Sequence, residues 1–151
     1  MELTVLSASF LGGTAIPSAH AYGGGSPPLA WSALPAGTKS IAIICDDPDA
    51  PSGDWVHWVI FNLPADTRRL DAGVPRAPRL PNGAVQGMND FGGTGYEGPS
   101  PPPGRPHRYI FRVYALDATL ALDSRARKKD VVEAMRGHVR AEGKLVGIYR
   151  R

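Results

Sequence analysis

The stretch DDPDAPSGDWVHWVIFNLP at residues 46–64 decides the fold of this chain, because it carries a compact loop between two strand patterns. The run before it, residues 39–46, is rich in isoleucine, and residues 56–63 are rich in valine, isoleucine and aromatic residues. Such side chains favour strands, and the proline and glycine of the loop bound both runs. We therefore predict two strands, joined by a loop with three carboxylates in its first four residues.

Further strand signals lie on both sides of this pair. Residues 2–7 form a short alternating run, residues 80–96 hold one strand and a loop, and residues 107–116 (HRYIFRVYAL) form another strong strand. The last short strand is expected at residues 144–149. Between these runs, proline and glycine segments such as EGPSPPPG at residues 97–104 exclude paired strands and helices.

Only the C-terminal part of the chain has helical signals. Asp130 and Glu133 have the spacing of a capping box at a helix start, and Gly143 is expected to end the helix. Three apolar side chains would share one face of this helix: Val132, Met135 and Val139.

Composition agrees with a fold of many short strands. The 151 residues include 18 glycines and 15 prolines, which suit turns better than helix interiors, while 42% hydrophobic residues provide a core. We predict one domain over residues 1–151: a mostly β, antiparallel β-sandwich of the Greek-key type with one C-terminal helix. No glycine-rich loop leads from a strand into a helix, which disfavours a nucleotide-binding fold.

Charge, cysteine content and hydropathy exclude several classes of protein. A net charge of +3 is too small to indicate nucleic-acid binding. The single cysteine, Cys45, excludes an internal disulfide framework and a multi-cysteine zinc site. No apolar run approaches the ~18 residues of a membrane-spanning helix, and the first residues lack the features of a signal peptide. We expect a cytoplasmic protein without stable membrane insertion.

Two of the predicted strands begin with a histidine and an aromatic residue on one face. Strict alternation places four side chains of each strand together. These sets are Trp55, His57, Val59 and Phe61 in one strand, and His107, Tyr109, Phe111 and Val113 in the other. A single histidine is most often structural or exposed, but two at equivalent strand starts indicate the wall of a pocket at the end of a hydrophobic core.

The acidic loop adds carboxylates to this pocket. Asp46, Asp47 and Asp49 lie too close together to remain charged unless hydrogen-bond donors or cations neutralise them. Pro48 and Pro51 stiffen the loop, which suits a fixed geometry. For at least one of the three aspartates, capping of a turn is the expected role.

These segments resemble the signatures of a known family. Residues 46–64 resemble the first signature of the phosphatidylethanolamine-binding protein family, and GYEGPSPPPGRPHRYIFRVYALD at residues 95–117 resembles the second. The flanking segments SPPLAWSALPAGTKSIAIICDDPDAP, VQGMNDFG and GKLVGIYRR resemble the short bacterial branch known as Raf-kinase-inhibitor-like. The resemblance covers nearly the whole chain.

The resemblance implies a β-sandwich with a small anion-binding pocket near one edge. Matched motif by motif, it implies eight ligand-binding residues: Asp47, Asp49, Trp55, His57, Pro101, Pro102, His107 and Tyr109. Imidazole and tyrosine donors suit the oxygens of an anion, and Asp47 would orient an imidazole rather than touch the ligand. The sequence departs from the family at Ser100, where many relatives have cysteine, and at residues 22–25, where bacterial relatives often carry a longer loop.

Three functions remain open at this point. The preferred hypothesis is a regulatory module that binds a phosphate-like or otherwise anionic small ligand without a cofactor. The second is an enzyme that uses Asp49, His57, His107 and Tyr109 for acid–base chemistry, although no Gly-x-Ser-x-Gly motif is present. The third is a protease or kinase inhibitor. No metal site is expected, because the histidines lack a close ligand spacing; relatives of this size suggest a homodimer.

Overall fold

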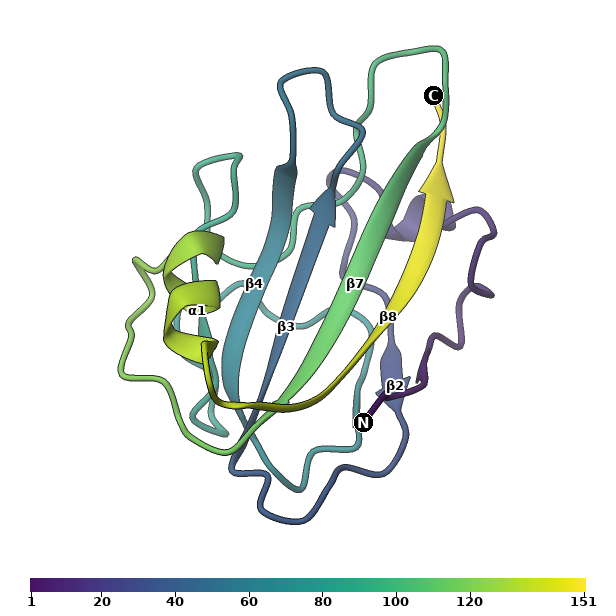
Figure 1. Ribbon diagram of the computed structural model, residues 1–151. Coiled ribbons are helices and arrows are strands. Elements are labelled where there is room, and N and C mark those ends of the chain that lie inside the picture. The colour runs from purple at the N-terminus through teal and green to yellow at the C-terminus, as the bar shows by residue number, and fades with distance from the viewer.

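The computed structural model describes residues 1–151 and places the strands in two antiparallel sheets (Figure 1). Strands β1, β2 and β5 form a small sheet, and strands β6, β4, β3, β7 and β8, in that order, form a larger one. The elements are β1 (Val5–Leu6), the 3-10 helix η1 (Ser18–His20), β2 (Leu29–Trp31), β3 (Ser40–Asp47), β4 (Trp55–Pro64), β5 (Arg69–Leu70), β6 (Val85–Gln86), β7 (His107–Leu116), α1 (Lys128–Met135) and β8 (Val139–Tyr149). The predicted mostly β fold with two antiparallel sheets and a short helix near the C-terminus is confirmed.

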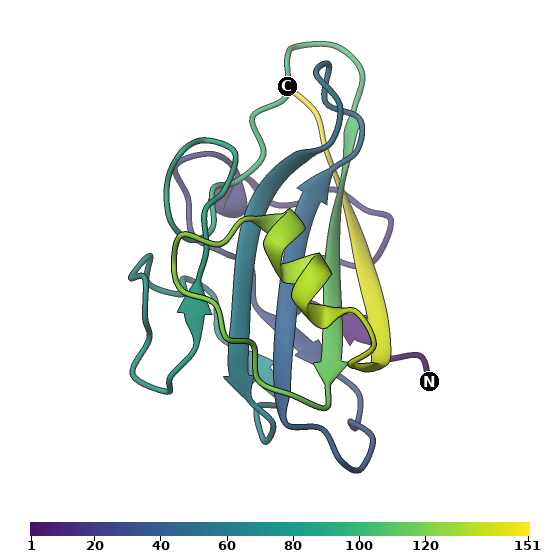
Figure 2. The same cartoon turned by 60° about the vertical axis from the view of Figure 1, so that its left-hand side comes forward.

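The large sheet has a layer of side chains on each face. Its inner face packs against the small sheet around a core of twenty buried residues, which includes Trp58 and Phe111. Its outer face is covered by α1, which lies across the strands in Figure 2 and closes a second core of eleven residues. Strand β3 is central in the sheet and all eight of its residues are buried, because it is covered on both faces. This explains the unbroken apolar run at residues 41–45.

Helix α1 differs from the prediction at both ends. It begins at Lys128, and the Asp130 carboxylate, three residues into the helix, accepts a hydrogen bond from the Arg127 backbone N–H at 2.9 Å. It ends before Gly137, whose φ of +81° is the left-handed conformation that terminates helices. The buried face consists of Val131 and Met135. None of the helices is long and apolar enough to cross a membrane.

The apolar face predicted for α1 is wrong, because the helix begins and ends earlier in the sequence than expected. Val132 is 39% exposed on the helix, and Val139 is the first residue of β8. Strand β8 therefore begins five residues earlier than expected, and the chain continues in it through Gly143 instead of ending a helix there. The strands β2 and β5 were not predicted, because segments of three and two residues carry no measurable alternation.

A β-bulge in β4 overturns the predicted alternation. Cys45 of β3 pairs with Trp58, but the next residue, Asp46, pairs with Val56, so His57 is an extra residue without a partner. Because of this extra residue, Trp55 and His57 face the cavity described below, whereas Val59 and Phe61 point to the opposite side, under α1. In β7, by contrast, the alternation is regular, and His107, Tyr109, Phe111 and Val113 share one face as predicted.

Candidate functional site

A cavity of about 210 Å³ lies at one end of the large sheet, where the ends of three neighbouring strands meet. Strand β3 runs antiparallel to both β4 and β7, so its last residue, Asp47, lies beside the first residues of the other two. Loops at residues 50–52, 91 and 100–102 complete the wall. The volume is below the roughly 300–1,000 Å³ of sites for drug-sized ligands, so the cavity suits a small molecule.

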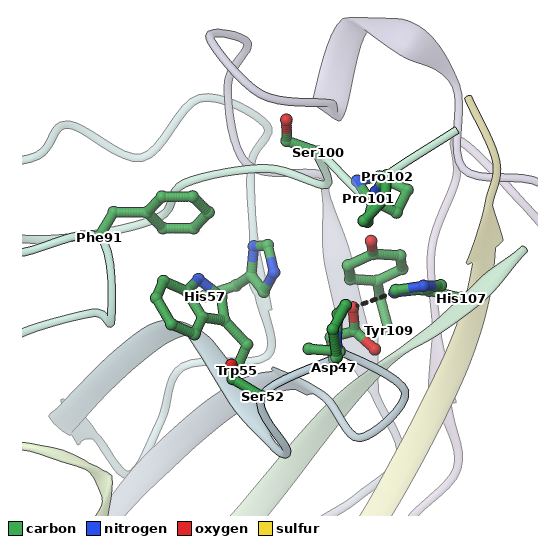
Figure 3. Close-up of a pocket in the computed structure, with 12 residues that line it drawn as sticks. Asp47, Ser52, Trp55, His57, Phe91, Ser100, Pro101, Pro102, His107 and Tyr109 are labelled. Carbon is green, nitrogen blue, oxygen red and sulfur yellow. Dashed lines mark hydrogen bonds and ion pairs between the residues drawn. The ribbon is translucent and has the colours of Figure 1, made fainter. Parts of the chain in front are cut away.

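All the predicted ligand-binding residues except Asp49 line this cavity. These residues are far apart in the sequence, but they lie together because the ends of β3, β4 and β7 are neighbours in the sheet. Figure 3 shows their side chains around the cavity. The cavity residues among the predicted set are Asp47, Trp55, His57, Pro101, Pro102, His107 and Tyr109.

Each aspartate of the acidic loop has a different partner, so the expected neutralisation is found. Asp49 lies outside the cavity, where its carboxylate forms two hydrogen bonds of 2.9 Å with the Arg108 side chain. The Arg108 side chain lowers the pKa of Asp49 to about 2, so this carboxylate stays charged. Asp46 points to the other face of the sheet, where Lys128 of α1 binds it at 2.5 Å. Asp49 is therefore no longer a candidate for chemistry in the cavity.

Asp47 is the carboxylate of the cavity and orients His107. Its Oδ1 accepts a hydrogen bond from the Asp49 backbone N–H at 2.8 Å, which is the predicted turn-capping role. Its Oδ2 lies 2.7 Å from Nδ1 of His107. A carboxylate accepts hydrogen bonds, so Nδ1 carries the proton and Nε2 of His107 is left without a protein partner.

His57 is oriented by a backbone carbonyl instead. Its Nδ1 lies 2.5 Å from the carbonyl oxygen of Glu97, which can only accept a hydrogen bond, so Nδ1 carries the proton here too. The side chain is 2% exposed, and this burial lowers the pKa of His57 against the opposing effect of the Glu97 hydrogen bond. At neutral pH the ring is therefore uncharged, with its Nε2 lone pair without a protein partner.

Tyr109 adds a hydroxyl donor between the two imidazoles. Its ring centroid lies 5.1 Å from that of His57, in an edge-to-face arrangement. Burial and then the nearby Asp47 carboxylate raise the pKa of Tyr109, so its hydroxyl group keeps its proton at neutral pH. Tyr109 can therefore donate to an oxygen of a bound molecule.

No activated nucleophile accompanies these groups. Ser52 and Ser100 line the cavity, but neither hydroxyl forms a hydrogen bond with an imidazole; that of Ser100 lies 3.5 Å from the Arg151 side chain. Burial raises the pKa of the Cys45 thiol well above its usual value, which keeps it an unreactive thiol. No group of three or more His, Cys, Asp or Glu side chains is placed to hold a metal ion.

Phe91 is an aromatic cavity residue that the sequence did not predict. It lies on a turn at residues 89–93, and its ring centroid is 5.2 Å from that of His57 and 5.5 Å from that of Trp55. The segment VQGMNDFG was recognised as a flank of the family pattern without being assigned to the pocket. The sequence signal for Phe91 is Asn89, a residue type that favours turns, two positions before this aromatic side chain.

Comparisons with known proteins agree with the fold and the motifs. The family model for phosphatidylethanolamine-binding protein matches residues 6–150. A UPF0098 protein of the archaeon Methanothermobacter thermautotrophicus is 58% identical over 138 residues, which cover 90% of this chain and 91% of that one. The UPF0098 protein YbhB of Escherichia coli is 47% identical over 76% of this chain and 78% of its own length.

Solved structures give the same result. The crystal structure of Escherichia coli YbcL matches with a TM-score of 0.92 and 36% identity, covering 100% of this chain and 99% of that one. That of a Chlamydia trachomatis homologue of the phosphatidylethanolamine-binding proteins has a TM-score of 0.89, also with 36% identity, over 99% of this chain and 98% of that one. The chain therefore belongs to the phosphatidylethanolamine-binding protein family, in its bacterial and archaeal branch with YbhB and YbcL.

Proposed function

We propose that the protein binds a small oxyanion, a phosphate or a phosphate monoester, in the cavity at the ends of β3, β4 and β7. The observation that carries the proposal is the pair of imidazoles, each with Nδ1 committed to a protein acceptor and Nε2 left for a ligand. The Tyr109 hydroxyl supplies a donor that does not depend on pH near neutrality. Membership in a family named for a phosphate-bearing lipid headgroup supports the same ligand class.

Binding depends on protons in this arrangement. With Nδ1 protonated, Nε2 of a neutral imidazole accepts hydrogen bonds and repels the lone pairs of an anion. Protonation turns Nε2 into a charged donor, which forms a shorter and stronger hydrogen bond to an oxyanion. The anion is therefore held by neutral donors such as the Tyr109 hydroxyl at high pH, and by imidazolium as well at lower pH.

The first prediction concerns binding of inorganic phosphate. Amide chemical shifts are expected to change most at residues 47–58 and 101–109, and His57→Ala should leave a folded protein with weakened binding. The matched control is His138→Ala, since His138 is half exposed, pairs with Asp117 and does not line the cavity. Shift changes confined to the basic residues 125–151 would contradict the proposal, and an unfolded His57→Ala would make His57 a structural residue.

The second prediction concerns pH. The affinity for sulfate, whose charge is constant between pH 5 and 8, is expected to rise as the pH falls, because Nε2 of His57 becomes a charged donor. Burial lowers the pKa of His57, so the rise is expected below the ordinary imidazole value of about 6.5. Isothermal titration calorimetry in two buffers of different ionisation heat would measure proton uptake with binding. A constant affinity without proton uptake would contradict the role of the imidazoles.

A third prediction separates a binding protein from an acid–base enzyme. His107→Gln keeps a hydrogen-bond donor beside Asp47 but removes the titratable ring. A binding site is expected to lose about 1–3 kcal/mol of affinity, the range from a neutral to a charge-assisted hydrogen bond. A general acid–base catalyst would lose about 10²–10⁴ in rate while still binding. We expect no turnover of phosphate or carboxylic esters; turnover that His107→Gln abolishes with binding intact would establish an enzyme instead.

A further inference from the structure

The cavity has a polar side and an aromatic side. In Figure 3, Asp47, His107 and Tyr109 lie on one side of His57, and the rings of Trp55 and Phe91 lie on the other. The Trp55 and Phe91 rings meet at an interplanar angle of 85° with their centroids 5.5 Å apart. A phosphate held on the polar side would therefore leave the space beside these two rings for a further part of the ligand.

Phe91 is held in place although it contributes to neither core. It is 39% exposed and belongs to neither cluster of buried residues. Its turn is fixed by Asn89, which is 1% exposed and whose Oδ1 accepts hydrogen bonds from the Phe91 and Gly93 backbone N–H groups at 3.0 and 3.1 Å. The Asn89 amide donates to the Gly95 carbonyl at 2.9 Å. A rigid turn that presents an exposed phenyl ring to a cavity indicates a contact with a ligand.

Tyr22 supports Phe91 from outside the cavity. The two ring centroids are 5.6 Å apart. The loop that carries Tyr22 is anchored to the other wall, because the Tyr22 N–H donates to the Pro99 carbonyl at 2.9 Å and the Gly23 N–H donates to the Glu97 carboxylate at 3.1 Å. The aromatic side is therefore held by contacts from two loops, the turn that carries Phe91 and the loop that carries Tyr22.

The aromatic side also lacks a carboxylate available to a cation. Asp49 is bound by Arg108, and the Glu97 carboxylate forms hydrogen bonds of 2.8 and 3.2 Å with Arg76. The acids next to the two rings in the chain are paired as well: Asp54 lies 2.7 Å from Lys128, and Asp90 accepts a hydrogen bond of 2.7 Å from the Val56 N–H and lies 3.7 Å from Arg127. The remaining acid of the cavity, Asp47, lies on the polar side and is hydrogen-bonded to His107. The surroundings of the two rings therefore favour a neutral apolar group, which gains from edge-to-face and stacked contacts, over an ammonium group.

We propose that the ligand is a phosphate monoester with a neutral, planar apolar substituent, of the aryl phosphate type, whose ring packs against Trp55 and Phe91. This inference rests on the proposed binding of an oxyanion at the polar side. Phe91 is then a specificity-determining residue: it distinguishes the ester from inorganic phosphate without touching the phosphate group.

The experiment compares three probes by calorimetric titration: inorganic phosphate, phenyl phosphate and phosphocholine. Phenyl phosphate is expected to bind about tenfold more tightly than inorganic phosphate, in the range of one aromatic contact, and phosphocholine no more tightly than inorganic phosphate. Phe91→Ala should reduce the ratio of the phenyl phosphate affinity to the inorganic phosphate affinity to about one. Leu11→Ala is the matched control, since Leu11 is an apolar side chain that is 75% exposed and does not line the cavity.

The outcomes separate this inference from the proposal on which it rests. Equal affinities for phenyl phosphate and inorganic phosphate would overturn the aromatic subsite and leave oxyanion binding intact. Preference for phosphocholine that Phe91→Ala removes would replace the neutral substituent by a cation and overturn the inference as well. Absence of inorganic phosphate binding to the unmodified protein at low pH would overturn the oxyanion site itself.

Discussion

Val59→Asp is expected to lower the free energy of unfolding by more than about 3 kcal/mol, because it places an unpaired carboxylate in the core under α1. Val59 has no exposed surface and belongs to the cluster of eleven residues between the large sheet and the helix. A domain of this size is stable by roughly 5–15 kcal/mol, so the variant should unfold at far lower temperature or remain unfolded.

Thermal and urea denaturation followed by circular dichroism would measure this loss. The matched control is Val132→Asp, the same change on the exposed face of α1, where an effect within about 0.5 kcal/mol is expected. Equal stability of the two variants would contradict the burial of Val59 in the core under α1.

Gly98→Ala is expected to destabilise the protein by about 1–3 kcal/mol and to weaken oxyanion binding. A Cβ at residue 98 would lie 2.3 Å from the carbonyl oxygen of His20 and from the carbonyl carbon of Ala21. These are backbone atoms, so one of the two loops must move away. Because Gly98 precedes the cavity residues Pro101 and Pro102, the displaced loop should widen the cavity.

Urea denaturation and a phosphate titration on the same samples would separate the two effects. Gly93→Ala is the control, since the nearest atoms to its Cβ lie 3.9 Å away, an ordinary van der Waals contact. Its stability should match that of the unmodified protein. A Gly98→Ala variant as stable as Gly93→Ala would show that residues 20–21 and 98 are not packed together.

The sequence predicted the central strands well and the faces of β4 badly, for a physical reason. Strands are recognised by β-branched residues between turn residues, and β3, β4 and β7 have both. The side that a residue faces is inferred from alternation of apolar and polar residues, but β4 is buried on both sides. Val56, Trp58, Val59 and Ile60 are all apolar, so the extra residue at His57 leaves no mark in the pattern.

Long-range contacts limited the prediction of the site in the same way. The strand pattern and the family resemblance both placed His57 and His107 in one pocket, and the structure places both in the cavity. The ion pair that holds Asp49 outside the cavity joins residues 59 positions apart, and the contact of Phe91 with Trp55 joins a turn to the start of β4. Local patterns contain no information on such pairs, because they depend on how the loops pack.

The position of β3 between β4 and β7 also has a consequence for the order of assembly of the molecule. The β3–β4 hairpin closes a short loop, whereas the contact of Asp47 with His107 joins residues 60 positions apart. Pairing between residues far apart in the sequence is slow, because the chain loses the entropy of the closed loop before the stabilising contacts form. The polar wall of the cavity is then complete only when β7 has joined the sheet. A ligand bound there would act on the completed sheet and slow its unfolding, rather than accelerate its formation.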